Sequence, residues 1–155
     1  MTHPIMFDDR DPLLLRVREI ALRFPDAAEK ISHGHPAFYT TKVFAYYGGS
    51  LKIDGEWRQH HQSVLVLPDP DDRAALLSDP RCYVPGYLGA AGWIGVDLDG
   101  DTDWDEIAEL LDASYRRTAG PRRVARLSSR SAPSPAGPDT PATESPARPA
   151  RSTPR

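Results

Sequence analysis

Residues 37–67 read AFYTTKVFAYYGGSLKIDGEWRQHHQSVLVL, and this stretch decides the fold. Its aromatic and β-branched residues, which favour β-strands, gather in three segments: Ala37–Thr40, Val43–Tyr47 and Ser63–Leu67. The dipeptides Gly48-Gly49 and Asp54-Gly55 are typical of turns and lie between them. Because parallel strands need long crossover connections, these short links predict an antiparallel sheet.

Helix signals lie on both sides of this stretch. Each of the three expected helices begins with an aspartate N-cap: Asp11 before Pro12, Asp69 before Pro70, and Asp103 in a capping box with Glu106. Apolar residues follow Asp11 and Asp103 at helical spacing, which predicts one buried face for each of these two helices.

Two more strands are expected at Cys82–Tyr87 and Trp93–Leu98, around a glycine-rich turn. The element order is then α-β(3)-α-β(2)-α. Helices on one face of an antiparallel sheet make a two-layer α+β sandwich, which is the predicted fold class. Trp93 and Trp104 each begin an apolar element, so both are expected in the core.

The composition changes sharply at Gly120-Pro121. Eight of the sixteen prolines lie in residues 121–155, together with seven arginines and no aromatic residue. Such a segment cannot bury enough apolar surface to order itself, so residues 120–155 are predicted to be a disordered Pro/Arg-rich tail. Residues 11–119 are the expected folded domain, and residues 1–10 a flexible N-terminus.

The charge of the chain is uneven, because residues 121–155 carry a net +5 and the rest a net −8. An acidic domain repels polyphosphates unless its positive charges are clustered. One cysteine, no signal-peptide pattern and no apolar run near 20 residues indicate a cytoplasmic protein without a membrane segment.

No group of residues predicts a catalytic or metal site, so we expect neither an enzyme nor a cofactor. His33, His35, His60 and His61 could supply metal ligands, but turns and polar loops explain them as well. Cys82 lies in a strand-like segment and is expected to be a small core residue rather than a nucleophile. The alternating aspartates from Asp97 to Asp105 lack the ligand order of a calcium loop.

Several blocks of sequence carry a family resemblance. They are 29–38 (EKISHGHPAF), 42–45 (KVFA), 76–81 (LLSDPR), 83–89 (YVPGYLG), 92–96 (GWIGV), 104–107 (WDEI) and 113–116 (ASYR). In this order they resemble the MmcQ/YjbR family, over roughly Asp11 to Ala119. The resemblance implies an α+β fold similar in topology to type III secretion chaperones. It also implies DNA binding, by likeness to a double-wing DNA-binding domain, and no known catalytic residues.

The sequence therefore predicts DNA binding through basic hairpins, weak and independent of DNA sequence. The candidate contact residues are Lys42, Lys52, Arg58, His60, His61 and Arg81. The aromatic residues between them could stack on bases. The alternative is a chaperone-like module that binds a protein partner. DNA binding through these residues requires the four Lys and Arg side chains to share one face that is clear of carboxylates.

Overall fold

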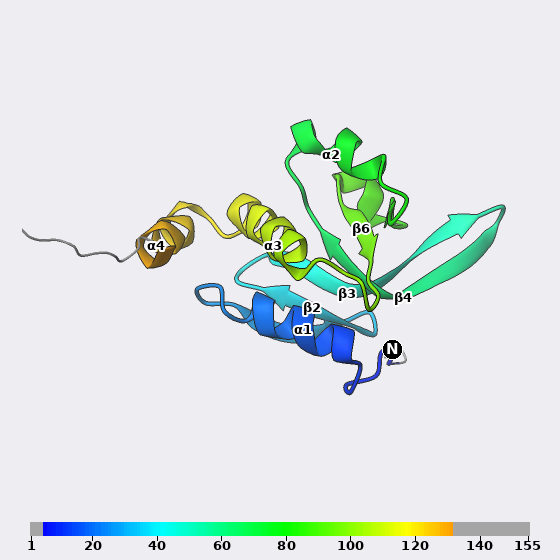
Figure 1. Ribbon diagram of the computed structural model, residues 1–155, viewed down its shortest axis with the longest axis horizontal. Helices are drawn as coiled ribbons and strands as arrows, with labels where there is room; N and C mark the ends of the chain where they lie inside the picture. Colours follow the sequence, from blue (N-terminus) through cyan, green and yellow to red (C-terminus); the bar gives the residue numbers. More distant parts are fainter. Residues whose placement is uncertain (1–4, 132–155) are drawn as a thin grey trace, which may run out of the picture.

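A computed structural model describes residues 5–131 and shows a six-stranded sheet with four α-helices in this part of the chain (Figure 1). The elements are α1 (Pro12–Ala21), β1 (Ala28–Ser32), β2 (His35–Tyr39), β3 (Val43–Ile53), β4 (Glu56–Val66), α2 (Pro70–Leu77), β5 (Cys82–Tyr83), the 3₁₀ helix η1 (Leu88–Ala91), β6 (Ile94–Asp97), α3 (Trp104–Thr118) and α4 (Pro121–Ser131). The strand order is β1-β2-β3-β4-β6-β5, and every neighbouring pair is antiparallel. The predicted α+β fold with an antiparallel sheet is confirmed.

The three aspartate N-caps lie where the sequence places them. The side chains of Asp11, Asp69 and Asp103 each accept a hydrogen bond from the backbone N–H two residues later. Glu106 differs from the expected capping box, because its carboxylate accepts hydrogen bonds from Arg81. No helix within residues 5–131 combines the length and apolarity that crossing a bilayer requires.

The sheet has one strand more than predicted, because β1 precedes the expected first strand and pairs with β2. Asp54-Gly55 is the turn of the β3–β4 hairpin, with φ of 52° and 81°. Gly48-Gly49, predicted as a turn, instead lies inside β3, where the register shifts at a bulge and Gly48 has φ of 86°. A bulge and a turn need the same left-handed glycine, which explains the error.

The strand predicted at Cys82–Tyr87 ends after two residues. Gly86 N–H donates to the carbonyl of Ser50, so the chain turns away from β6 towards the β3–β4 hairpin. This hairpin extends beyond the rest of the sheet and is the most prominent projection of the molecule (Figure 1).

The main core lies between one face of the sheet and helices α1 and α3. Its largest fully buried side chains are Tyr47, Tyr115, Phe38, Phe44, Leu14, Ile94, Ile107 and Leu111. A smaller cluster of Leu65, Tyr83 and Trp93 lies on the opposite face of the sheet, where Leu88 of η1 packs against it. Trp93 is buried as predicted, with 7% of its surface exposed, but Trp104 is only half-buried at the rim of the main core, where Arg16 lies 5.0 Å above its ring.

Both ends of the described chain differ from the sequence prediction. Residues 121–131, predicted to be disordered, form α4, and Leu127 of this helix is buried in the main core. Residues 132–155 of the predicted tail lie outside the described residues. In the segment predicted as a flexible N-terminus, Met6 N–H donates to the carbonyl of Gly34 and Phe7 packs against the main core.

Candidate nucleic-acid interface

The β3–β4 hairpin brings together only two of the predicted contact residues, Lys52 and Arg58. Both are exposed near its tip, where Lys52 pairs with Trp57 across the strands and Arg58 with Leu51. Asp54 and Glu56 occupy the same tip and are exposed too. Two cations and two carboxylates in one short turn leave no net positive charge there for a phosphate.

The other predicted residues lie elsewhere. Lys42 precedes β3 and Lys52 is near its end, so the strand separates them by roughly 30 Å. Arg81 is bound to Asp79 and to Glu106, at 2.7 Å and 3.0 Å. Hydrogen bonds from the side chain and backbone of Arg81 lower the pKa of the Asp79 carboxyl to about 2, so it remains charged opposite Arg81. The four Lys and Arg side chains therefore do not form one face that is clear of carboxylates.

The two neighbouring histidines on β4 also have different surroundings. His60 Nδ1 lies 2.7 Å from Asp97 Oδ1, and its ring stacks on Tyr83. His61 is exposed. Within residues 5–131, no three His, Cys, Asp or Glu side chains are placed to share a metal ion.

A different group of cations gathers where α3 ends and α4 begins. Between Ala113 and Leu127 the chain has five arginines and no acidic residue. The β2–β3 turn lies beside them, because Arg123 donates to the Thr41 hydroxyl at 3.3 Å. We call this group the arginine surface: Lys42, Arg116, Arg117, Arg122, Arg123 and Arg126.

The carboxylates at the arginine surface are few. Asp26 accepts from Arg123 and Arg126 at 3.0 Å and 2.9 Å, and Asp112 pairs with Arg116. Lys42, Arg117 and Arg122 are exposed, and no carboxylate pairs with them among residues 5–131. Six cations thus meet two carboxylates, so the surface is strongly positive.

Local packing holds α4 in this position. Gly120, with φ of 92°, ends α3 in a left-handed conformation, and Pro121 starts the next helix. Leu127 then reaches the main core, while Arg123 binds both Asp26 and the carbonyl of Ala119. Arg122, Arg123 and Arg126 are therefore presented by a packed helix at one end of the molecule, next to the loop that joins α1 to β1 (Figure 1).

Comparison with known proteins agrees with this fold. The YjbR family model matches residues 22–117. The chain belongs to the YjbR family. A crystal structure of a Pseudomonas syringae protein, determined by a structural genomics consortium, is similar with a TM-score of 0.52 at 16% identity, covering 67% of this chain and 97% of the other. No curated protein sequence matches significantly.

The YjbR match contains the sheet and most of α3 but neither α1 nor α4. The arginine surface is therefore built partly on a helix outside the matched region. Sequence reasoning missed this helix because its prolines and arginines look like those of the tail. The signal was present in Pro121, Val124 and Leu127, a helix-starting proline followed by two apolar residues one turn apart.

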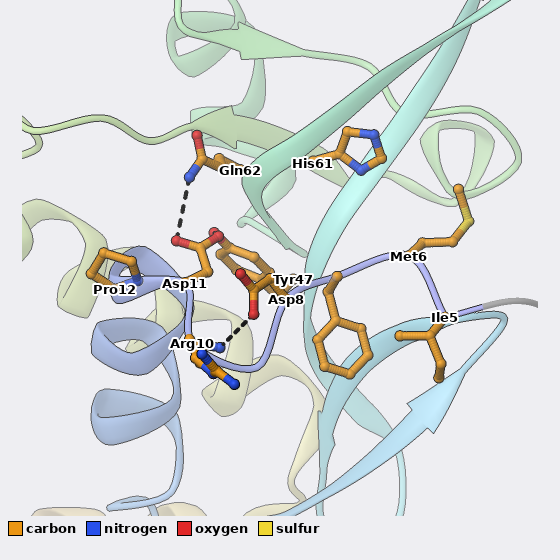
Figure 2. A pocket seen from close by; sticks show the side chains of 10 residues that line it. Ile5, Met6, Asp8, Arg10, Asp11, Pro12, Tyr47, His61 and Gln62 are labelled. Atoms are coloured by element: carbon orange, nitrogen blue, oxygen red, sulfur yellow. Dashed lines mark hydrogen bonds between the residues drawn. The ribbon is translucent and has the colours of Figure 1, made fainter.

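A pocket lies beside α1, and its carboxylates serve the protein's own structure (Figure 2). It has a volume of about 560 Å³ and lies between the N-terminal segment and the start of α1. Asp11 in its wall caps α1 and also accepts from the Tyr47 hydroxyl and from Gln62. Asp8 accepts from the backbone N–H of Arg10. Since these carboxylates are engaged with the protein itself, the pocket offers little to a ligand.

Proposed function

We propose that this YjbR protein is a non-enzymatic nucleic-acid-binding module that contacts the phosphate backbone through the arginine surface. The observation that carries the proposal is the run of five arginines without an acidic residue, folded onto one end of the domain beside Lys42. Guanidinium groups form paired, charge-assisted hydrogen bonds to phosphate, so exposed Arg117 and Arg122 suit this contact.

The proposal moves the DNA contact away from the hairpin predicted from sequence. Positive charge at the hairpin tip is cancelled by Asp54 and Glu56, whereas the arginine surface keeps an excess of cations. Phosphate contacts of this kind fix orientation but carry no sequence information. The expected binding is therefore weak and independent of sequence, with a Kd of roughly 10⁻⁴–10⁻⁶ M near physiological salt.

The environment of Cys82 argues against a nucleophilic role for this residue. The thiol is half-buried, and burial raises its pKa to about 11. It is therefore protonated near neutral pH, where a nucleophilic cysteine would need to be a thiolate.

The test is a titration of labelled duplex DNA with the full-length chain at several salt concentrations. Two double variants are compared with the unmodified protein: Arg117→Gln with Arg122→Gln, and Lys52→Gln with Arg58→Gln. Each pair removes two positive charges, so the total charge of the two variants is matched. We expect only the first pair to weaken binding and to reduce the slope of log K against log salt, by about 2.

The outcomes of this titration distinguish the arginine surface from the hairpin and DNA binding from a protein partner. Loss of binding in the hairpin variant alone would return the contact to the site predicted from sequence. No binding by the unmodified chain at low salt would exclude direct DNA binding and favour a protein partner.

A specific observation favours that second function, a protein-interaction module. Trp57 is 43% exposed and stacks on Tyr87, which is 88% exposed, with Ile53 also exposed near the tip. Exposed aromatic residues of this kind are common at the centres of protein interfaces. Purification of partners with the unmodified chain and with a Trp57→Ala variant as baits tests it, since a true partner at this surface would be lost with Trp57.

A further inference from the structure

One carboxylate at the arginine surface is bound to two guanidinium groups at once. Asp26 Oδ2 accepts from Arg123 Nε at 3.0 Å and from an Arg126 guanidinium nitrogen at 2.9 Å. The two arginines are three residues apart on α4, so they lie on the same side of the helix. Their guanidinium groups converge on one oxygen atom, and groups that converge in this way also bind the oxygens of a phosphate.

This position is accessible from solution. The side chains of Asp26 and Arg126 are 46% and 55% exposed, so an anion as large as phosphate can reach them. Hydrogen bonds from Arg123 and Arg126 lower the pKa of the Asp26 carboxyl, which is therefore charged at neutral pH. Because this carboxylate is tethered beside the two arginines, it has a high effective concentration there compared with a phosphate in solution.

The packing around Asp26 has anchors other than the carboxylate. Pro25 is buried, and its carbonyl accepts from the Tyr115 hydroxyl at 2.7 Å, which fixes the turn between α1 and β1. Leu127 attaches α4 to the main core. Exposed ion pairs contribute little to stability by comparison. The turn and the helix should therefore keep their positions when the carboxylate is removed.

We propose that Asp26 competes with phosphate within the chain: its carboxylate occupies the position between Arg123 and Arg126 that a phosphate oxygen of nucleic acid would otherwise take. The inference rests on the proposed function, since it concerns the affinity of the same surface. Two arginines of the surface are masked in this way, which keeps the binding of nucleic acid weak.

The first experiment titrates labelled duplex DNA with the full-length chain and with two variants, Asp26→Asn and Asp112→Asn. Both variants remove one negative charge from the arginine surface, but Asp112 is paired with one arginine, Arg116, on its own helix. Asparagine suits position 26, because the φ of 62° there is one that Asp and Asn adopt more readily than most residues. We expect Asp26→Asn to bind DNA about tenfold more tightly than the unmodified chain, and Asp112→Asn about threefold or less.

A double-mutant cycle separates masking from a general effect of charge. Arg126→Gln is the second change, because Arg126 is exposed and its hydrogen bond goes to Asp26. In the unmodified chain Arg126 is masked, so its loss should change DNA affinity less than about twofold, whereas in the Asp26→Asn background it should weaken binding about fivefold. Equal effects in the two backgrounds would overturn the proposal.

Inorganic phosphate distinguishes a failure of this inference from a failure of nucleic-acid binding. The probe is the Nε–Hε signal of Arg123 in the ¹⁵N-labelled full-length chain. Phosphate should shift this signal at concentrations about tenfold lower in Asp26→Asn than in the unmodified chain. Asp26→Gly, which the left-handed backbone also accommodates, should give the same result and removes any hydrogen bond that an asparagine amide would retain.

The combined results decide both questions. If the unmodified chain binds DNA and neither Asp26 variant binds more tightly than Asp112→Asn, the inference is wrong and the proposed function stands. If no form of the chain binds DNA but phosphate still binds both Asp26 variants more tightly, the masked phosphate position stands and nucleic acid is not its ligand. If phosphate affinity at Arg123 is the same in all forms, Asp26 does not compete with phosphate.

Discussion

The backbone conformation of Tyr87 predicts how two substitutions at this residue differ in stability. Ordinarily glycine is less favourable than alanine in a folded chain, by roughly 0.5–1 kcal/mol. At φ of 63° the order should reverse, because only glycine adopts this conformation without strain. We predict that Tyr87→Gly is more stable than Tyr87→Ala by about 1 kcal/mol, measured by urea denaturation. Equal stability, or a more stable alanine variant, would show that the backbone at this position relaxes.

The two tryptophans that the sequence placed in the core should differ in their contribution to stability. Trp93 is buried in the small cluster and contacts Tyr46 edge-to-face, so Trp93→Ala should cost about 3–5 kcal/mol. Trp104 lies at the rim and half in solvent, so Trp104→Ala should cost clearly less. The free energies of unfolding of both variants check this, and a larger cost for Trp104 would contradict the burial described here.

At the scale of elements, α4 is the part of the C-terminal region whose removal should matter. Leu127 is 8% exposed and belongs to the main core, so Leu127→Ala should destabilise the fold by about 2–3 kcal/mol. A chain that ends at residue 131 should keep the thermal midpoint of the full chain, and one that ends at residue 120 should lose several degrees. Thermal unfolding of both truncations checks this. Equal midpoints would mean that α4 contributes no stability.

The sequence predicted those elements whose signal acts between residues that are close in the chain. An aspartate N-cap acts on N–H groups two residues away, so all three caps could be read directly. Strand β1 could not, because its residues are mostly polar and half-exposed and it is a strand only through pairing with β2. Gly48-Gly49 shows the same limit, since tertiary pairing decides whether a left-handed glycine turns the chain or bulges a strand.

The candidate site was less predictable than the fold, because a charged surface depends on which distant residues meet. Lys52 and Arg58 are close in sequence to each other and also to Asp54 and Glu56, so their shared tip could have been judged neutral. The pairing of Arg81 with Glu106, 25 residues away, has no local signal. The bond between Arg123 and Asp26, 97 residues apart, helps to hold α4 against the domain and has no local signal either.

At the scale of the whole molecule, charge is separated along α3. Its N-terminal end and the preceding loop carry Asp99, Asp101, Asp103, Asp105 and Glu106, and its C-terminal end leads into the arginine surface. This polarity matches the helix dipole, which favours anions at the N-terminus and cations at the C-terminus. The net charge of −8 for residues 1–120 therefore hides two ends of opposite sign, and it does not oppose phosphate binding at one of them.

The separation predicts how the acidic end influences DNA binding. Along α3, Asp105 lies roughly 17 Å from Arg116, and Asp101 precedes the helix; this separation is beyond the screening length of about 8 Å at 0.15 M salt but within the roughly 30 Å of 0.01 M salt. The double variant Asp101→Asn with Asp105→Asn should therefore bind duplex DNA more tightly than the unmodified chain at 0.01 M salt and equally at 0.15 M. DNA titrations at the two salt concentrations measure this effect. The double variant Arg117→Gln with Arg122→Gln is the control, and it should weaken DNA binding at both salt concentrations. If removal of the two aspartates strengthened binding equally at 0.15 M, the DNA would lie against the acidic end, and the proposed contact at α4 would be wrong.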